Sequence, residues 1–298
     1  MSFKNIRRQA YHTIRDSYRK KLQHIDFPGI SSFQHGLDIQ QAIMSQNLNF
    51  KSFESALAKQ LDPSSSEITS HLYQCQPPPT LLTFQFQHTY AGGLKSKKQL
   101  TQTQIKAFTQ LLLPATSHNV ALPRQAQAPP KFYQLERGGQ VTYHGPGQLV
   151  AYLILDLREF VKLTPKCFVN NVLLKSLQNV LRDNFEIASH LSSDNPGVWI
   201  KNREGEDEKL ASVGVRIRRG VTEFGVAVNV DPQLDYLNTF EMCGLKNRAT
   251  SIREILEKRS RSGDESVCKL QSVETCAGFY AAEIGRVLEL DTVEKIVL

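Results

Sequence analysis

The sequence of 298 residues contains no uninterrupted apolar run as long as the roughly 18 residues that a membrane-spanning helix needs. Its longest aliphatic stretches, such as residues 149–155, have the length of a strand. We therefore expect no membrane span. The apolar content of 40% is ordinary for a folded protein and is enough for one substantial core.

Cysteine is scarce, and its spacing suggests no pairs: the five cysteines form no CxxC motif and their number is odd. They are Cys75, Cys167, Cys243, Cys268 and Cys276. This usage predicts neither a disulfide framework nor a metal site. It fits a reducing compartment, where one cysteine can be a nucleophile and the others small buried side chains.

Nucleotide-binding signatures are also missing. Neither the phosphate-binding loop GxxxxGK[ST] nor the dinucleotide fingerprint GxGxxG occurs in the chain. The net charge of +7 does not indicate a nucleic-acid partner, because residues 1–21 contribute +6 of it. The remaining residues are almost neutral, whereas nucleic-acid binding calls for a broad basic surface.

Residues 1–21 have seven basic side chains and Asp16 as the single acid. The apolar residues Phe3, Ile6, Ala10 and Ile14 recur there at helical spacing. A basic, amphipathic, acid-poor leader is typical of a mitochondrial transit peptide, which we predict for residues 1–21. The alternative is a basic first helix that the mature protein retains.

Periodicity predicts the main elements of the chain. Strands are expected over residues 80–87, 148–157, 198–200, 211–217 and 221–230, the last two as a hairpin that turns at Arg219-Gly220. Gly92-Gly93 predicts a turn, and polar loops are expected over residues 115–131 and up to Glu208. Helices are expected from Thr164-Pro165 to about residue 184 and over residues 273–288. The mixture predicts an α+β fold in one domain.

The segment RGGQVTYHGPGQ, residues 137–148, has the highest concentration of glycine beside polar side chains. Glycine allows backbone amides to approach a ligand closely and permits positive φ angles. Arg137 and His144 would supply polar contacts. Spacing alone leaves two interpretations open, a loop that cradles a substrate and a set of tight turns.

As a string, residues 137–152 resemble the signature of octanoyl-(acyl-carrier-protein):protein octanoyltransferases, also called lipoyl(octanoyl) transferases. The resemblance continues through DNPGVWI at 194–200, KLASVGVRIRR at 209–219, GVAVN at 225–229 and MCG at 242–244, and covers roughly residues 22–290. Two positions depart from the family pattern: Phe224 precedes Gly225 where the family often has histidine, and Glu241-Met242 precede the cysteine in place of Asn-Pro.

The resemblance implies a single catalytic domain, residues 22–298, similar to the catalytic fold of biotin and lipoate protein ligases. It implies that Cys243 is the nucleophile and Lys209 its partner. The substrate-binding residues that it implies are Arg137, Gly138, Gly139, Gln140, Val141, Thr142, Tyr143, His144, Ser212, Val213, Gly214, Gly225, Val226 and Ala227.

Elementary chemistry supports the Cys243–Lys209 pair. The thiolate is the nucleophilic form of cysteine, and a nearby ammonium lowers a thiol pKa from its reference of about 8.5. The same lysine can move protons while an acyl group passes from a thioester to an amine. Because a thioester donor is already activated, no cofactor or ATP is required.

The resemblance also implies partners and a location. Octanoyl-acyl carrier protein would be the donor, and the acceptors would be lipoyl domains of the glycine cleavage H protein and of the E2 subunits of 2-oxoacid dehydrogenases, in the mitochondrial matrix. Arg216, Arg218 and Arg219, with Lys201 and Arg203 nearby in sequence, could steer such acidic domains. Alternatively, these are scattered solvated side chains.

Two other functions remain to be separated from this one. An ATP-dependent lipoate or biotin protein ligase would share the fold but need no cysteine nucleophile. A non-catalytic protein that binds lipoyl domains would need neither Cys243 nor Lys209.

Overall fold

The computed structural model describes residues 21–60, 74–113, 128–238, 248–262 and 268–298. Its strands are β1 (Lys21–Ser31), β2 (Thr80–Phe86), β3 (Thr89–Gly92), β4 (Lys131–Gln134), β5 (Thr142–His144), β6 (Gln148–Ile154), β7 (His190–Leu191), β8 (Gly197–Lys201), β9 (Asp207–Arg218), β10 (Val221–Asn229) and β11 (Thr292–Val297). Its helices are α2 (Phe33–Gln60), α4 (Leu94–Lys97), α5 (Gln102–Gln110), α6 (Pro165–Cys167), α7 (Lys175–Phe185), α8 (Asp235–Asn238), α9 (Ile252–Arg261) and α10 (Val273–Val287).

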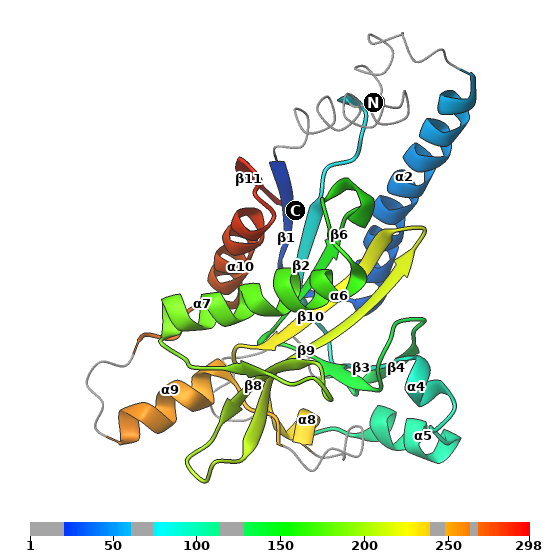
Figure 1. The fold of residues 1–298 in the computed structure, drawn as a ribbon. Coiled ribbons are helices and arrows are strands. Elements are labelled where there is room, and N and C mark those ends of the chain that lie inside the picture. The colour runs from blue at the N-terminus through cyan, green and yellow to red at the C-terminus, as the bar shows by residue number, and fades with distance from the viewer. Residues whose placement is uncertain (1–20, 61–73, 114–127, 239–247, 263–267) are drawn as a thin grey trace.

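Two sheets organise these elements. The larger one has eight strands in the order β11-β1-β2-β6-β10-β9-β8-β7, and the smaller one has the order β4-β3-β5. Strand β1 runs parallel to both of its neighbours, whereas β2, β6, β10, β9, β8 and β7 are paired antiparallel. Figure 1 views the large sheet from the side covered by α7 and α10, with α2 behind the strands.

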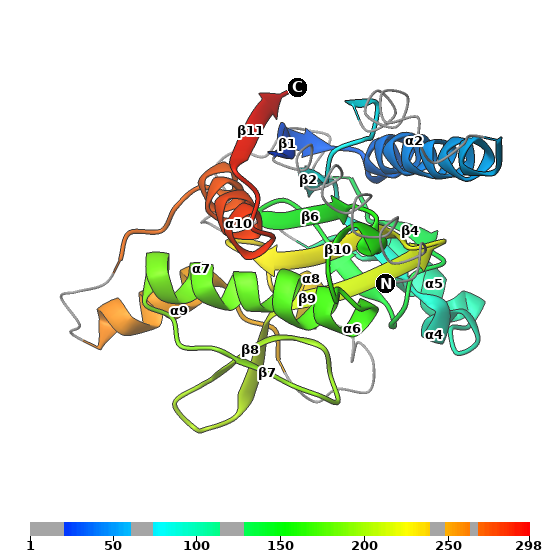
Figure 2. The ribbon, with the colours of Figure 1, turned by 45° about the horizontal axis from the view of Figure 1, so that its top comes forward.

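Each face of the large sheet has its own core. One face packs against α7, α9 and α10 through residues such as Leu177, Tyr280 and Ile255. The other face packs against α2 and the small sheet through residues such as Phe33 and Met44. Figure 2 shows α7 and α10 together on one side, apart from α2. The predicted α+β single domain is confirmed.

The two predicted helices are present. Thr164 caps the first, its side chain accepting a hydrogen bond from the Cys167 amide, and the helical path continues through α6, a π-helical stretch at Phe168–Leu174, and α7. Its apolar residues recur at helical spacing and face the sheet. The second, α10, begins after the Ser272 cap. Local signals were therefore sufficient for both.

The predicted β9–β10 hairpin is also confirmed. Arg219 and Gly220 have φ angles of +51° and +89°, the left-handed pair that a tight two-residue hairpin turn requires. The polar loop expected up to Glu208 is shorter than predicted, because β9 begins at Asp207. Glu208 is buried and its carboxylate lies 3.6 Å from Lys258 Nζ, so an acidic side chain is accommodated inside the sheet.

The turn predicted at Gly92-Gly93 was wrong for Gly92, which ends strand β3. Strand β3 is the buried centre of the small sheet, paired with β4 and β5, and Gly93 caps helix α4. Of the loop predicted over residues 115–131, only residues 128–131 are described, and Lys131 begins β4. Residues 1–20 of the predicted leader lie outside the described residues, whereas Lys21 begins β1 and pairs with Thr292.

Of the two alternatives for the basic side chains, a common patch and scattered side chains, their positions along β9 favour the second. Lys201 lies beside Asp207 at the start of β9, and Arg218 and Arg219 lie at its other end. At about 3.3 Å per residue, the length of β9 separates them by about 36 Å. Arg218 Nε contacts the Glu223 carboxylate at 2.8 Å, and Arg219 hydrogen-bonds Ser52.

Candidate active site

A small, partly open cavity of about 40 Å³ lies on the α2 face of the large sheet. Nine of the residues implied by the resemblance line it, namely Arg137, Thr142, His144, Ser212, Val213, Gly214, Gly225, Val226 and Ala227. They come from β5, β9, β10 and the loop after β4. A space of this size holds little more than a water molecule or two. A larger occupant would extend beyond this space or displace its walls.

The cavity also has walls that sequence reasoning missed, Leu135, Val150, Tyr152 and Phe224. A period of two along β6 could have found Val150 and Tyr152, because alternate residues of a strand share one face. Phe224 has a left-handed backbone with φ +64°, and its amide donates to Gln40 Oε1 of α2 at 2.6 Å. That contact between distant segments has no signal in the local sequence.

Arg137 organises the glycine-rich loop from inside the protein. Its guanidinium is buried and donates to the backbone oxygens of Gly138 at 2.9 Å and Ala91 at 2.8 Å. A Cβ atom on Gly214 would lie 2.9 Å from Arg137 Cδ, so strand β9 needs glycine to let the arginine pass. The Gly138 amide then donates to the Val215 oxygen and joins the loop to β9. Arg137 therefore shapes the cavity by holding its walls.

Five residues of the glycine-rich segment do not line the cavity: Gly138, Gly139, Gln140, Val141 and Tyr143. Since side chains alternate along β5, Tyr143 points away from Thr142 and His144. It joins a buried aromatic cluster, stacked 5.2 Å from Tyr236 and hydrogen-bonded to His88 Nδ1 at 2.5 Å. Burial raises the pKa of Tyr143 well above its ordinary value, so it remains a neutral phenol.

His144 forms one wall of the cavity. Its ring stacks on Phe33, with centroids 5.6 Å apart, and its Nδ1 lies 2.8 Å from Gln148 Oε1. Burial lowers the pKa of His144 to about 4, with a smaller contribution from the positive charge of Arg137. At neutral pH the imidazole is therefore uncharged.

Lys209 lies on the face of the large sheet that has the cavity, because strand β9 has a bulge. Gly197 pairs with Ser212 and Trp199 with Lys209, with a one-residue shift in register between them. In a regular strand, Lys209 and Ser212 would point to opposite faces, but the extra residue brings them to the same one. Lys209 Nζ lies 4.9 Å from the centroid of the Trp199 ring, and a Cβ on Gly197 would lie 2.8 Å from Lys209 Cε. The lysine is thus packed in place.

Cys243 lies outside the described residues, but the two ends of its segment are described. The Asn238 side chain accepts a hydrogen bond from the Ala249 amide at 2.8 Å, so the residue before this segment contacts the chain that follows it. The Lys209 amide donates to the Arg248 oxygen at 2.9 Å, and the Thr250 amide donates to the Lys209 oxygen at 3.0 Å. Residues 248–250, which follow this segment, are therefore held beside Lys209.

The other four cysteines differ from one another in setting. Cys75 is exposed, Cys167 and Cys268 are half-buried, and Cys276 lies on the buried face of α10, inside the core. Burial raises the pKa of the Cys276 thiol to about 12, which disfavours the thiolate. Among the residues that the structure describes, no cluster of histidine, cysteine and carboxylate side chains could hold a metal ion, and no helix could cross a membrane.

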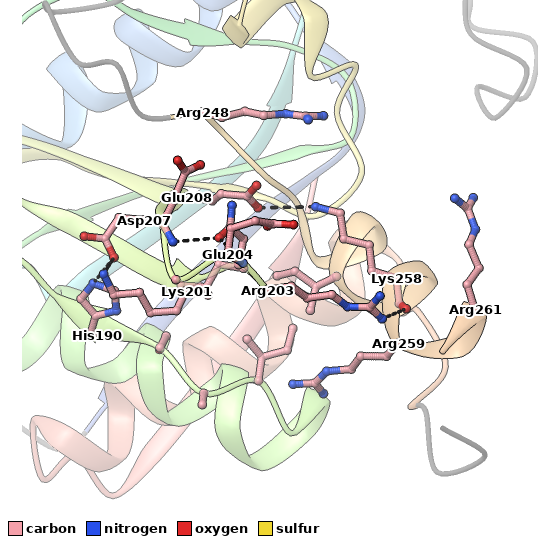
Figure 3. Close-up of a pocket in the computed structure, with 18 residues that line it drawn as sticks. His190, Lys201, Arg203, Glu204, Asp207, Glu208, Arg248, Lys258, Arg259 and Arg261 are labelled. Atoms are coloured by element: carbon pink, nitrogen blue, oxygen red, sulfur yellow. Dashed lines mark hydrogen bonds and ion pairs between the residues drawn. The ribbon is translucent and has the colours of Figure 1, made fainter. Parts of the chain in front are cut away.

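A much larger cleft, of about 1180 Å³, lies on the opposite face of the β8–β9 pair (Figure 3). Ile200 and Glu208, which point away from Trp199 and Lys209, line it together with charged side chains from α9. Figure 3 shows Lys258, Arg259 and Arg261 along one wall and His190 beside Asp207 on the other. The mixed charge of the cleft contrasts with the cavity, where Arg137 is the one charged side chain among the described residues that line it.

The sequence of the chain is similar to a known family of enzymes. The model of the lipoyl protein ligase A/B catalytic domain matches residues 46–267. The chain belongs to this family. It is 35% identical to the mitochondrial octanoyltransferase of Kluyveromyces lactis, over 95% of this chain and 85% of that protein. It is also 35% identical to the mitochondrial octanoyltransferase of Saccharomyces cerevisiae, over 97% of this chain and 88% of that protein.

Solved structures share the architecture at low sequence identity. A lipoate-protein ligase A bound with ATP superposes with a TM-score of 0.52 and 10% identity, covering 94% of this chain and 89% of that one. The P. falciparum protein LipL1 in complex with lipoate gives a TM-score of 0.51 at 13% identity, covering 93% of this chain and 66% of that one. These likenesses establish the fold, as the sequence resemblance implied.

Proposed function

We infer that the chain is an acyltransferase that moves an octanoyl group in protein lipoylation, and we propose that it does so through a thioester on Cys243 assisted by Lys209. The first part follows from the two octanoyltransferases that match nearly the whole chain. The observation that carries the second is the position of Lys209, which shares the cavity face and is hydrogen-bonded to the backbone that follows the Cys243 segment.

The reaction proceeds in two balanced steps. The Cys243 thiolate attacks the carbonyl carbon of the donor thioester, the donor carbon–sulfur bond breaks, and the departing thiolate takes a proton from the Lys209 ammonium. A neutral acceptor amine then attacks the acyl-enzyme, the bond to Cys243 sulfur breaks, and neutral Lys209 takes the proton that the amine loses. An amide forms and the Cys243 thiolate is regenerated beside a charged lysine.

The cavity is suited to the acyl chain. Its walls at Leu135, Val150, Tyr152 and Ala227 are apolar or aromatic and buried. Burial of each methylene or methyl group stabilises the complex by about 0.8 kcal/mol, which gives roughly 6 kcal/mol for the seven carbons beyond the carbonyl. The hollow of about 40 Å³ is far smaller than an eight-carbon chain, so we propose that its walls separate when the chain binds.

We propose an octanoyl-acyl carrier protein as donor and lipoyl domains as acceptors, including the H protein and the E2 subunits. Protein lipoylation implies a lipoyl-domain acceptor, and a thioester donor supplies the activation that ATP would otherwise provide. The mitochondrial names of the two relatives support a mitochondrial location, and we propose the matrix.

Deletion of residues 1–20 should leave activity in vitro unchanged and the protein cytosolic in cells.

Mass spectrometry of the intact protein tests the covalent step. Incubation with octanoyl-acyl carrier protein alone should add one octanoyl group that hydroxylamine removes, and an apo lipoyl domain should discharge it as an amide. Cys243→Ala should lose both steps, and Cys243→Ser should bind donor but transfer poorly, because a hydroxyl is far less acidic than a thiol. The matched control is Cys75→Ala, since Cys75 is exposed.

The same assay separates the alternatives. Transfer by Cys243→Ala from free octanoate plus ATP would identify a ligase, and binding of lipoyl domains without any transfer would identify a non-catalytic protein. Strict dependence on a thioester donor, with loss of activity in Cys243→Ala, excludes both.

A further inference from the structure

A chain of buried side-chain hydrogen bonds runs from the cavity to the segment beside Lys209. His144 Nδ1 lies 2.8 Å from Gln148 Oε1, and Gln148 Nε2 donates to Asn229 Oδ1 at 2.9 Å. Asn229 Nδ2 donates to the Thr250 backbone oxygen, also at 2.9 Å. All four residues are at least 94% buried.

We call this chain of hydrogen bonds, through residues 144, 148, 229 and 250, the relay. The Thr250 backbone oxygen at its end fixes which atom donates in each of its bonds. A backbone oxygen can only accept, so Asn229 must turn its NH₂ group toward Thr250 and its Oδ1 toward Gln148. Gln148 must then donate through Nε2 to Asn229, which leaves Oε1 as the acceptor that faces His144. The hydrogen of His144 is therefore on Nδ1, and Nε2 has a lone pair.

Both ends of the relay lie at functional positions. His144 lines the cavity with its ring held against Phe33, and among the described residues the side chain has one hydrogen bond, through Nδ1. At the other end, the Thr250 amide donates to the Lys209 oxygen at 3.0 Å. The relay thus crosses strands β6 and β10 and connects the cavity wall to the backbone of the lysine.

We propose that Gln148 and Asn229 are positioning residues for acyl transfer, which hold His144 as its Nδ1–H tautomer and couple the cavity wall to the Thr250–Lys209 backbone. An Nε2 lone pair can accept a hydrogen bond from an N–H or O–H group but cannot donate one to an oxyanion. His144 therefore does not stabilise the tetrahedral oxyanion, and it presents an acceptor to any donor that enters the cavity. The coupling to Lys209 rests on the proposed function, whereas the tautomer does not.

Three variants separate this role from simple packing. Gln148→Met and Asn229→Leu remove the polar groups with little change in volume. Asn179→Leu is the matched control, because Asn179 is a buried amide that bonds to Glu283 in the helical layer, away from the cavity. All three should lose stability, but only the two relay variants should lose transfer rate, by up to about a hundredfold from misplacement of reacting groups.

The kinetic pattern is specific. Gln148→Met and Asn229→Leu should lower kcat more than they raise KM for the octanoyl donor, and the double variant should be no slower than the slower single variant, since the two act as one unit. Additive losses, or rates in both relay variants equal to that of Asn179→Leu, would overturn the proposal.

Nuclear magnetic resonance of ¹⁵N-labelled histidine gives a readout independent of activity. The intact protein at neutral pH should show His144 protonated at Nδ1 alone, and Gln148→Met should lose this fixed tautomer. Gln148→Glu should keep the Nδ1 bond and raise the pKa of His144 above about 4, with Arg137 as the opposing charge. An Nε2–H tautomer in the intact protein would refute the relay even if Cys243 is the nucleophile.

Discussion

The large sheet has a hollow on each face, and the two are opposite in character. The cavity on the α2 face is about 40 Å³ and is lined by neutral groups, apart from Arg137, whose donors are directed to backbone oxygens. The cleft on the α9 face is about 1180 Å³, and its charged side chains are largely exposed. The smaller hollow is lined by nine of the residues that we propose for substrate binding, and its mostly neutral walls suit an aliphatic chain.

The ionic contacts in the cleft illustrate the difference. Lys201 Nζ lies 2.8 Å from Asp207, and Lys258 Nζ lies 3.1 Å from Glu254, with about half of each lysine side chain exposed. Exposed pairs of this kind contribute about 0–1 kcal/mol each. In the cavity the contacts are buried, and a lost partner leaves a polar group unsatisfied at about 1–3 kcal/mol. Changes on the cavity face should therefore have larger effects.

The largest effect is expected for Lys209→Met, which keeps the packing against Trp199 but removes the ammonium. Loss of the proposed proton-transfer group should lower kcat about 10²–10⁴-fold while thermal stability changes little. Lys201→Met is the matched control on the cleft side of the same strand pair. Equal losses in the two variants, measured by octanoyl transfer, would contradict the distinction between the faces.

The stability of the protein should depend on pH through one buried histidine on each face of the large sheet. Burial lowers the pKa of His24, on the α10 side, and of His144, in the cavity, to about 4 from 6.5. Since the unfolded chain binds these protons between pH 6.5 and pH 4 and the native chain does not, stability is complete above pH 6.5 and is lost as pH falls toward 4. Each histidine contributes up to about 3 kcal/mol to this loss.

Denaturant unfolding between pH 7 and pH 4 measures how the free energy of unfolding changes with pH. His24→Gln should make the slope shallower by removing one of the two groups while leaving an amide that can hydrogen-bond Thr83. An unchanged slope in this variant would show that His24 is not held neutral in the folded protein.

A smaller effect is expected for Gly225→Ala, at a wall of the cavity. A Cβ atom there would lie 2.2 Å from the Ala151 oxygen, so β6 and β10 would have to separate. Overpacking of this kind costs about 1–3 kcal/mol, and transfer should fall with it. Gly278→Ala is the control, because a Cβ at Gly278 of α10 meets nothing within 4 Å and alanine favours a helix. Urea midpoints should shift in opposite directions.

The smallest effect is expected for Arg259→Ala in the cleft. Its guanidinium donates to the backbone oxygens of Phe185 and Glu186 at 3.4 and 3.0 Å, near the surface. We expect stability to change by less than about 1 kcal/mol and the kcat of transfer to stay within about twofold. A raised KM for the carrier-protein donor would instead show that the cleft contributes to docking.

Local sequence was enough wherever apolar residues form a run or a regular repeat, as in strands β2, β6 and β10, which are buried almost throughout. Strands β2, β6 and β10, the turn at Arg219-Gly220, and helices α7 and α10 all follow from periodicity and capping, because their cores need a fixed repeat. Helix α2 is different, since its Gln- and Ser-rich sequence has no broad apolar stripe and it was not predicted. Its contacts with the sheet, including Gln40 to Phe224, decide its place.

The resemblance to the family motifs pointed to the glycine-rich loop and to Lys209 from the sequence alone, because each lies within a contiguous motif. Tertiary structure decided which of them meet. The bulge in β9 turned Lys209 to the cavity face, alternation along β5 turned Tyr143 away from it, and residues 144, 148, 229 and 250 joined into one relay across three segments. A one-residue change in register inverts every side chain of a strand, so these directions become fixed only when the strands pair.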